Sequence, residues 1–376
     1  MLTLIATTTF GLEKVVKNEL KALGFPKSRG FDGGVEFEAT VADIPRVNFW
    51  LRSADRVQLK MGTFTAVTFD ELFEQTKAIP WEAWIPVDGR FTVKGKSVKS
   101  QLSNVSACQS IVKKAVVDRL KSKYHVDWFE ETGASYTIQV ALLHNKVTLT
   151  IDTSGSGLHK RGYRLDYGQA PIKETIGAAL VQLSFWNKER LLIDPMCGSG
   201  TILIEAAMIA RNIAPGLRRS FASQEWQAIP KADWDNARTE ARDSRHREQI
   251  DLQLTGYDID PKYIAYCKEN AKRAGVSKDV QFEQKDVKKL WIDQQYGVLI
   301  TNAPYGVRMA SFQELNQIYI SLNKTFRKKF GWSIYVLTAD KKFPNYFKRA
   351  KPNRVRKLYN GRIETHYYQY YGEKPT

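Results

Sequence analysis

Hydrophobic residues in the first 65 positions alternate between a two-residue and a helical spacing, which predicts a small module of mixed strands and helices. Residues 11–23 carry apolar side chains at helical spacing, and Gly24 follows them as a residue typical of helix C-termini. The predicted order is strand 2–9, helix 11–23, strand 33–39, helix 43–51 and strand 57–64. We therefore expect an α+β region over residues 1–65.

A second α+β unit is predicted over residues 66–153. Its predicted elements are helix 69–77, strand 91–96, helix 104–120, strand 135–142 and strand 146–152. His144-Asn145 would join the last two strands as a turn. A segment rich in glycine and basic residues follows, and this change of composition predicts a domain boundary with a linker over residues 154–168.

From residue 169 to the end, short apolar runs alternate with helical patterns, which indicates a parallel, doubly wound sheet. The predicted strands are 191–194, 252–258, 280–283, 298–302 and 333–338. The ending differs, because Asn360-Gly361 separates two strand-like runs and is a strong type I′ hairpin signal. A hairpin is antiparallel, so we expect the sheet to close with one reversed strand.

Composition narrows the class of protein. The chain has 376 residues, 43% of them hydrophobic, and no run approaches the roughly 18 apolar residues of a membrane span. The N-terminus lacks the pattern of a signal peptide. Three scattered cysteines and five histidines show no disulfide or metal-ligand spacing. The expectation is a cytosolic, metal-free protein with no membrane partner.

Charge points to a polyanionic partner. Lysine and arginine total 57 against 40 acidic residues, a formal net charge of +17. The linker carries Lys160 and Arg161, and twelve basic residues fall within 324–357, with aromatic residues between them. The candidate RNA contacts are Lys160, Arg161, Lys341, Lys342, Lys348 and Arg349. A solvated loop and a solvated face are the alternatives for these two segments.

Candidate chemistry begins after the first strand of the C-terminal part. Asp194-Pro195-Met196-Cys197-Gly198-Ser199-Gly200-Thr201 places an acidic residue and a Gly-x-Gly loop between a buried strand and a helix. Glycines let the backbone approach a ligand closely, and the helix N-terminus offers free amides. Neither the phosphate-loop motif nor the dinucleotide fingerprint fits, because the Lys-Ser/Thr pair is missing and Leu203 occupies the third glycine position.

Each later strand of the sheet also ends in a polar residue. Asp258 follows the second strand and suits a ribose diol, while Asp286 follows the third and suits an adenine amine. The fourth strand runs into Asn302-Ala303-Pro304-Tyr305, an amide acceptor close to a ring that can stack on a base. Each feature alone is compatible with a cap or a turn, but three ordered carboxylates before this loop favour a ligand site.

With these motifs the chain resembles the class I S-adenosylmethionine-dependent methyltransferases, and specifically the THUMP-domain family of RNA guanine-N2 methyltransferases. The bacterial large-subunit rRNA methyltransferases, whose longer relatives carry a second methyltransferase domain, match best. The resemblance covers nearly the whole chain. It rests on 194–201, on Asn212-Ile213-Ala214-Pro215-Gly216 with Ser220-Phe221 and Glu225-Trp226, and on Ala170-Pro171-Ile172-Lys173-Glu174-Thr175.

The resemblance implies a Rossmann-like class I fold, a mostly parallel seven-stranded sheet with an antiparallel C-terminal hairpin, over residues 169–376. It also implies a ferredoxin-like lead over 1–65 and a THUMP RNA-binding domain over 66–153. The implied cofactor is S-adenosylmethionine. Its implied contacts are Lys173, Asp194, Cys197, Gly198, Ser199, Gly200, Thr201, Asp258, Ile259 and Asp286.

The implied catalytic residues are Asn302, Ala303, Pro304 and Tyr305. The family loop reads Asn-Pro-Pro-Tyr, so Ala303 departs from it at the first proline. The backbone carbonyl of residue 303 survives that change, and Pro304 still favours an extended Ala303. The loss of local rigidity predicts a weakened rather than an inactive enzyme. Covalent catalysis by Cys197 is a rival mechanism, which its place within the cofactor loop disfavours.

The predicted function is methylation of guanine N2 in RNA, with 23S rRNA as the expected substrate. A tRNA guanine-N2 methyltransferase is the alternative within the class. A DNA adenine-N6 enzyme could use the same acceptor loop, but the THUMP-like lead argues against it. A non-catalytic RNA-binding or ribosome-assembly factor is the alternative from a different class, and Ala303 keeps it open.

Overall fold

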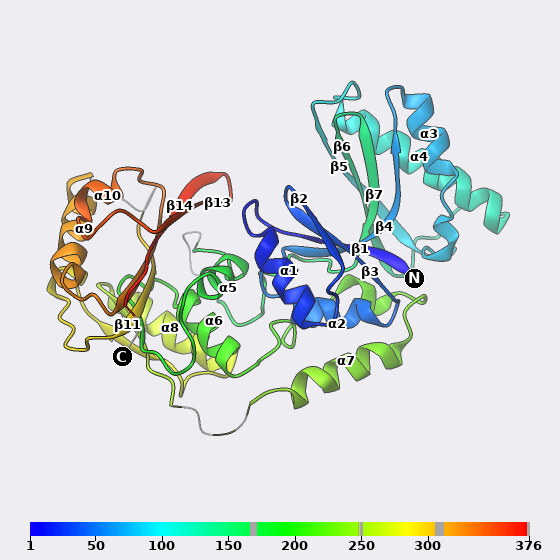
Figure 1. The fold of residues 1–376 in the computed structure, drawn as a ribbon. Coiled ribbons are helices and arrows are strands. Elements are labelled where there is room, and N and C mark those ends of the chain that lie inside the picture. The colour runs from blue at the N-terminus through cyan, green and yellow to red at the C-terminus, as the bar shows by residue number, and fades with distance from the viewer. Residues whose placement is uncertain (166–170, 247, 249–250, 305–311, 374–376) are drawn as a thin grey trace.

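The computed structural model describes residues 1–165, 171–246, 248, 251–304 and 312–373. Two seven-stranded sheets organise the molecule (Figure 1). The helices are α1 Glu13–Ala22, α2 Asp43–Trp50, α3 Phe69–Lys77, α4 Val105–Tyr124, α5 Glu174–Gln182, α6 Thr201–Ala210, α7 Lys231–Asp243, α8 Pro261–Ala274, α9 Phe312–Phe326 and α10 Phe343–Tyr346, with 3₁₀ turns η1 Trp81–Ala83, η2 Ala222–Glu225 and η3 Val287–Lys289.

The first sheet runs continuously through the two predicted N-terminal units. Its order is β2-β3-β1-β4-β7-β6-β5, with the long β4 between β1 of the lead and β7 of the second unit. Strand β2 has no counterpart among the predicted strands. The strands are β1 Leu2–Thr7, β2 Ser28–Phe31, β3 Gly34–Ala39, β4 Arg56–Thr65, β5 Arg90–Val98, β6 Ser135–Leu143 and β7 Lys146–Asp152. The two units therefore share one sheet.

The second sheet confirms the predicted fold class. Its order is β10-β9-β8-β11-β12-β14-β13, and all its strands are parallel except β14, which is antiparallel to both its neighbours. The strands are β8 Leu192–Asp194, β9 Leu254–Asp258, β10 Gln281–Gln284, β11 Gly297–Asn302, β12 Trp332–Thr338, β13 Arg354–Asn360 and β14 Ile363–Tyr370. The reversed strand β14 closes the sheet against β12, as predicted.

The turn of this hairpin differs from the predicted one by one residue. Asn360 pairs with Ile363, so Gly361 and Arg362 are the two central residues of the turn. Gly361 has a φ of +62°, whereas Arg362 is not among the residues with positive φ. A type I′ turn needs positive φ at both positions, and a glycine at the first position alone is typical of type II′. The type I′ prediction is therefore wrong, although the hairpin it indicated is present.

Local sequence signals explain where the helices begin and end. Asp260 accepts a hydrogen bond from the amide of Lys262 at the start of α8, and Pro261 occupies the first helical position. Gly275 ends the same helix in the left-handed conformation, with a φ of +79°. No helix in the described part of the chain is long and apolar enough to cross a membrane.

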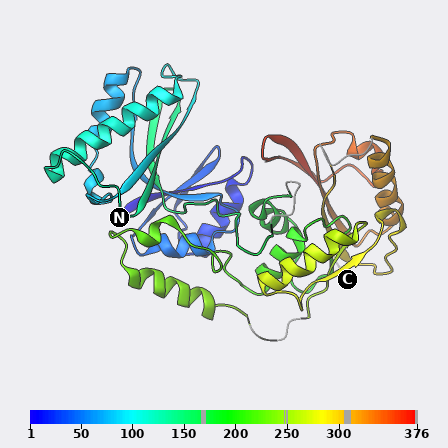
Figure 2. The same cartoon turned by 180° about the vertical axis from the view of Figure 1, so that it is seen from behind.

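An insert of the C-terminal domain, which contains η2 and α7, packs on the N-terminal units. In both views α7 lies beside α2, away from the other helices of its own domain (Figures 1 and 2). The Phe221 and Trp234 rings of the insert stack at 5.3 Å between centroids, and both contact the ring of Phe49. The N-terminal core is therefore completed by residues from beyond position 210.

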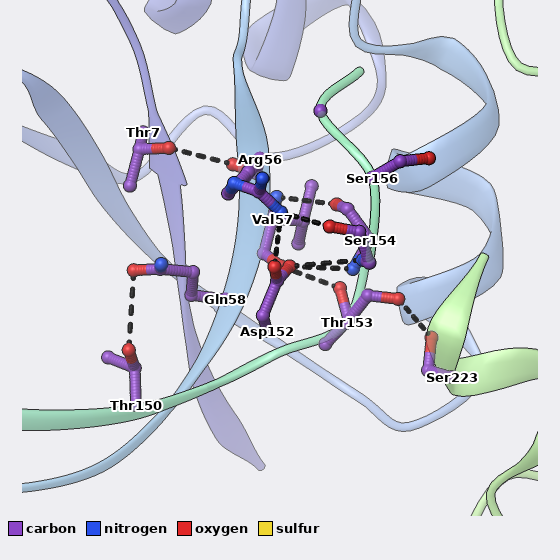
Figure 3. A network of polar contacts seen from close by, with 12 residues as sticks. Thr7, Arg56, Val57, Gln58, Thr150, Asp152, Thr153, Ser154, Ser156 and Ser223 are labelled. Atoms are coloured by element: carbon purple, nitrogen blue, oxygen red, sulfur yellow. Dashed lines mark hydrogen bonds and ion pairs between the residues drawn. The ribbon is translucent and has the colours of Figure 1, made fainter. Parts of the chain in front are cut away.

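A buried polar network holds the same junction (Figure 3). Arg56 of β4 pairs with Asp152 at the end of β7. Ser223 of η2 donates to the carbonyl of Thr153 at 2.8 Å, and Asn48 of α2 donates to the Thr153 hydroxyl at 2.9 Å. Because these groups satisfy one another away from water, the junction is built as an interior rather than as a loose interdomain contact.

Candidate active site

The C-terminal edge of the second sheet brings the ordered polar residues together. Asp194 ends β8 and Asp258 ends β9, while Asp286 follows β10 and Asn302 ends β11. These four strands are consecutive neighbours in the sheet, in the order β10-β9-β8-β11. The carboxyl ends of parallel strands are where open α/β sheets bind ligands.

Hydrogen bonds hold the Gly-x-Gly loop against the neighbouring strand β9. The Cys197 amide donates to the Tyr257 carbonyl at 2.8 Å, and the Gly198 amide donates to Asp258 Oδ2 at 3.0 Å. Gly198 has a φ of +53°, and a methyl group added there would meet no protein atom within 4 Å. The loop therefore presents an open, unobstructed backbone at the start of α6, which suits a ligand that packs closely against it.

Asp258 keeps acceptor capacity for a ligand. Its two oxygens receive the amides of Gly198 and Asp260, each at 3.0 Å, and a carboxylate has about four lone-pair sites. Burial raises the pKa of the Asp258 carboxyl. The adjacent Ile259 side chain is 62% exposed, an apolar surface beside the carboxylate. A diol over Asp258 and a flat ring against Ile259 would use both groups.

Four other predicted cofactor residues make contacts within their own segments or shape the start of α6. Asp286 accepts from the Lys288 amide at 2.9 Å and lies 3.6 Å from the Lys288 ammonium, so it caps η3. Ser199 and Thr201 bring their hydroxyl oxygens within 3.0 Å of each other at the start of α6. Gly200 is the N-cap of that helix, with a φ of +78°.

The Cys197 thiol is buried and lies 3.7 Å from the Cys267 sulfur. Burial raises the pKa of the Cys197 thiol well above its usual value. Because the thiolate is the nucleophilic form, this environment disfavours covalent catalysis by Cys197. Cys267 donates to the Gly198 carbonyl at 2.9 Å, so it helps to hold the loop.

The Asn302–Pro304 segment lies at the C-terminal end of β11. The Ala303 amide donates to the Leu337 carbonyl at 3.0 Å, a hydrogen bond that proline at this position would not make. This bond offsets part of the rigidity lost with the family proline. Asn302 Oδ1 is buried, and no hydrogen-bond partner for it occurs in the described part of the chain. Tyr305 lies outside the described residues.

Several residues that hold the site were not predicted. Arg164 donates to Thr201 Oγ1 at 2.6 Å and to the Ile172 carbonyl at 2.8 Å, which ties the segment before α5 to the cofactor loop. Asn270 donates to the Ser199 carbonyl at 3.1 Å. Asn270 is a polar residue on the buried side of α8, and that position in the helical pattern was the available signal for it. No local pattern marks Arg164, whose partners lie 8 and 37 positions away.

Lys173 is placed between two domains. Its ammonium lies 3.6 Å from Asp55 Oδ1, and the same carboxylate accepts from the Thr175 hydroxyl at 3.3 Å. Asp55 belongs to the loop that precedes β4 in the lead. The segment predicted to line the cofactor site is thus held by the N-terminal region.

The candidate RNA contacts separate into exposed and buried side chains. Lys160, Lys341, Lys342 and Lys348 are exposed, and Lys341 pairs with Glu364 at 3.2 Å. Arg161 is 2% exposed and lies 3.4 Å from Glu205, and its guanidinium also donates to the carbonyls of Leu158 and Arg52. The prediction that Arg161 contacts RNA is therefore wrong, because its guanidinium is buried and bonded to groups within the protein.

Arg349 also serves the fold. Its guanidinium donates to the Trp332 carbonyl at 2.8 Å and the Phe330 carbonyl at 3.1 Å, and burial lowers its pKa. These carbonyls lie at the start of β12, at the opposite edge of the sheet from Asn302. Arg349 therefore braces the start of β12, and the prediction that it contacts RNA stays a prediction.

Comparison with family models decides the membership of the chain. Residues 161–369 match the RMKL-like methyltransferase domain, residues 3–58 the RlmL ferredoxin-like domain and residues 66–152 the THUMP domain. The chain belongs to the RMKL-like methyltransferase family. The predicted resemblance is thereby confirmed.

Individual relatives agree with this membership. YpsC of Bacillus subtilis (strain 168) is 47% identical over 373 residues, which cover 99% of this chain and 96% of YpsC. The ribosomal RNA large subunit methyltransferase K/L of Psychromonas ingrahamii (strain DSM 17664 / CCUG 51855 / 37) is 35% identical over 373 residues, 97% of this chain and 49% of that protein. The chain thus spans about half the length of the K/L relative.

A solved relative identifies the cofactor class. The crystal structure of SMU.472 complexed with SAH has a TM-score of 0.93 to this chain at 38% identity, covering 100% of this chain and 99% of SMU.472. SAH is S-adenosylhomocysteine, the product that S-adenosylmethionine leaves after methyl transfer. The open loop at Gly198 and the acceptors of Asp258 fit such a group, and S-adenosylmethionine is the cofactor of this methyltransferase.

Proposed function

We propose that this methyltransferase methylates the exocyclic N2 amine of guanine in RNA, with large-subunit rRNA as the substrate. RNA is supported by the THUMP domain match and the net charge of +17. Large-subunit rRNA is supported by the K/L relative, which is named as a ribosomal RNA large subunit methyltransferase. The proposal for an amine acceptor rests on Asn302.

Asn302 Oδ1 carries this proposal. It is a buried acceptor at the C-terminal end of β11, without a hydrogen-bond partner in the described residues. A buried amide oxygen without a partner costs free energy, which a bound donor would recover. An exocyclic amine provides such donors, and the Ala303 carbonyl would be the second acceptor.

The roles of the chain's residues follow from this arrangement. The guanine amine is a poor nucleophile because its lone pair is delocalised into the ring. Asn302 and the Ala303 carbonyl would hold its two N–H bonds and so aim the lone pair. Positioning of this kind accounts for a large share of catalysis in many enzymes. Tyr305 would stack on a base flipped out of its helix, against an unstacking cost of a few kcal/mol.

The cofactor residues would act by binding and orientation. Asp258 would accept from the ribose hydroxyls and Asp286 from the adenine amine, with Ile259 against the ring. The loop 197–201 would lie along the methionine part, and Arg164 and Cys267 would fix that loop. S-adenosylmethionine supplies an activated methyl group on a sulfonium when it is bound. No residue needs to act as a covalent nucleophile in this scheme.

Three alternatives differ in the product they leave. A tRNA guanine-N2 methyltransferase would modify the same atom in a different RNA, and an adenine-N6 enzyme would modify a different base. A non-catalytic RNA-binding or assembly factor would leave no modified nucleoside. Mass mapping of modified nucleosides in rRNA and tRNA from a strain lacking the gene separates all of these. Loss of N2-methylguanosine from 23S rRNA is the expected result, and unchanged modification in every RNA contradicts catalysis.

Asn302→Ala tests the acceptor directly. We expect kcat on precursor rRNA to fall by about a hundredfold or more, in line with the removal of one catalytic hydrogen bond, while cofactor affinity stays near wild type. Asn323→Ala is a matched control, because Asn323 Oδ1 on α9 is also buried and has no hydrogen-bond partner among the residues that the structure describes. Equal activity in Asn302→Ala and the control would remove Asn302 from catalysis.

A further inference from the structure

The second sheet exposes basic and aromatic side chains together at the end opposite the active site, where β11 and β12 begin. Trp291 is 74% exposed, Phe330 59% and Tyr296 44%. The loops 290–297, 327–332, 348–354 and 371–373 meet there and contain seven basic residues against two acidic ones, Asp293 and Glu373. Rings of this size are usually buried, so their common exposure calls for a partner.

Contacts between distant segments define this surface. The Gln294 carbonyl accepts from Trp332 Nε1 at 2.8 Å and from the Lys329 ammonium at 3.4 Å. The Thr325 hydroxyl donates to the Leu290 carbonyl at 3.2 Å. Arg349 binds the Phe330 and Trp332 carbonyls, which brings the loop with Lys348 and Lys351 against the same edge. The segments therefore form one continuous surface.

The surface is ordered before any partner arrives. Trp291 Nε1 donates to Asp293 Oδ1 at 2.7 Å, which orients the indole. Lys328, Lys348 and Lys351 are exposed, and none of them is in an ion pair within the part of the chain that the structure describes. Fixed rings beside uncompensated cations are what binding of unpaired nucleotides needs, since bases stack while phosphates release counterions.

We infer that this basic–aromatic surface (Trp291, Tyr296, Phe330, Arg327, Lys328, Lys348 and Lys351) is a second RNA-binding site, remote from the catalytic loop. It rests on the proposed RNA substrate. Strand β11 has six residues, so about 20 Å separates the two edges. In Figure 1 the turn between β13 and β14 lies at one end of the sheet, and β14 runs from it to the other end. The substrate class is therefore a folded RNA that reaches both edges, rather than a short strand.

Equilibrium binding of labelled large-subunit rRNA, transcribed in vitro, tests this inference without cofactor. The triple variant Lys328→Ala, Lys348→Ala, Lys351→Ala should bind about tenfold or more weakly and lower the salt slope by up to about three. Trp291→Ala should weaken binding at least about fivefold. Both losses should disappear with a short stem-loop that fills only the active site.

Lys268→Ala, Lys272→Ala, Lys278→Ala is the matched control, since it removes three exposed lysines elsewhere on the domain. An equal loss of affinity in the control overturns the inference. Wild-type affinity in the first triple variant also overturns it, and an acidic protein is then the partner that fits the surface. The nucleosides that the wild-type protein methylates are mapped in a separate experiment. A protein that methylates rRNA yet ignores these substitutions retains its proposed function without the second site.

Discussion

One carboxyl group connects the cofactor loop to the catalytic strand. Asp194 is 1% exposed, and its Oδ1 accepts from the Thr301 hydroxyl at 2.7 Å and from the Met196 amide at 3.2 Å. Thr301 immediately precedes Asn302. We therefore propose that Asp194 acts on a ligand through the loop and strand that it joins, although a strand-terminal aspartate first suggested a direct contact.

The protonation of Asp194 should appear in the stability of the protein. Burial raises its pKa from 3.8 to about 7. Between these values the folded state retains a proton that the unfolded chain has released. The resulting stabilisation is complete below pH 3.8 and is lost as the pH rises through about 7.

Asp194→Asn keeps an acceptor for Thr301 but cannot ionise. In cofactor-free protein, the free energy of unfolding of wild type should fall relative to this variant as the pH rises from about 5 to 8, by at most about 1.4 kcal/mol per pH unit. Urea titrations at four pH values measure this difference. Asp32→Asn controls for the loss of one exposed carboxyl group. A difference between wild type and Asp194→Asn that does not change with pH contradicts the assignment.

At the scale of elements, the turn into α6 needs its two glycines for different reasons. Both Gly198 and Gly200 have positive φ. A methyl group at Gly198 would meet no protein atom, whereas at Gly200 it would lie 3.0 Å from the Phe282 ring and 3.2 Å from Cys267 Sγ. The first glycine leaves space above the loop, and the second allows the helix to pack on its neighbours.

Alanine at these positions should separate binding from stability. Gly198→Ala should cost about 1–2 kcal/mol of stability from backbone strain alone, and it should weaken S-adenosylhomocysteine binding if the ligand fills the open space. Gly200→Ala should cost more stability, because strain and crowding add. Thermal unfolding and calorimetric titration measure the two effects. Equal losses of stability would show that packing at Gly200 is unimportant.

At the scale of the whole molecule, the N-terminal region contributes to the cofactor domain. The Asp55 carboxylate holds Lys173 and Thr175, and the Asp55 carbonyl accepts from the Leu158 amide at 2.8 Å. Glu205 on α6 pairs with the buried Arg161, whose guanidinium also reaches the Arg52 carbonyl of the lead. The contacts run from the lead to both helices that flank the cofactor loop.

Asp55→Ala should therefore reduce cofactor affinity although Asp55 lies outside the methyltransferase domain. The ion pair is partly exposed, so we expect a loss of about three- to tenfold. The Michaelis constant for S-adenosylmethionine should rise while kcat changes little. Asp55→Asn, which retains an acceptor for Thr175, should recover part of the affinity. Unchanged affinity in Asp55→Ala would restrict its role to domain docking.

The sequence alone determined most of the strands and their order. Strands 298–302 and 333–338, the Gly-x-Gly loop and the C-terminal hairpin were predictable because each depends on residues that are neighbours in the chain. The order of Asp194, Asp258 and Asn302 along parallel strands was enough to place all three at one edge. The hairpin was located to within one residue, although its turn type was predicted wrongly.

Only the tertiary structure decided which polar groups face a ligand and which serve the fold. Arg161 meets Glu205 across 44 positions, and Lys173 meets Asp55 in another domain. Arg349 braces the start of a strand, which moves part of the basic run 324–357 to the far edge of the sheet. Charge in a sequence shows that a cation exists, but its partner depends on packing between distant segments, and no local pattern encodes that.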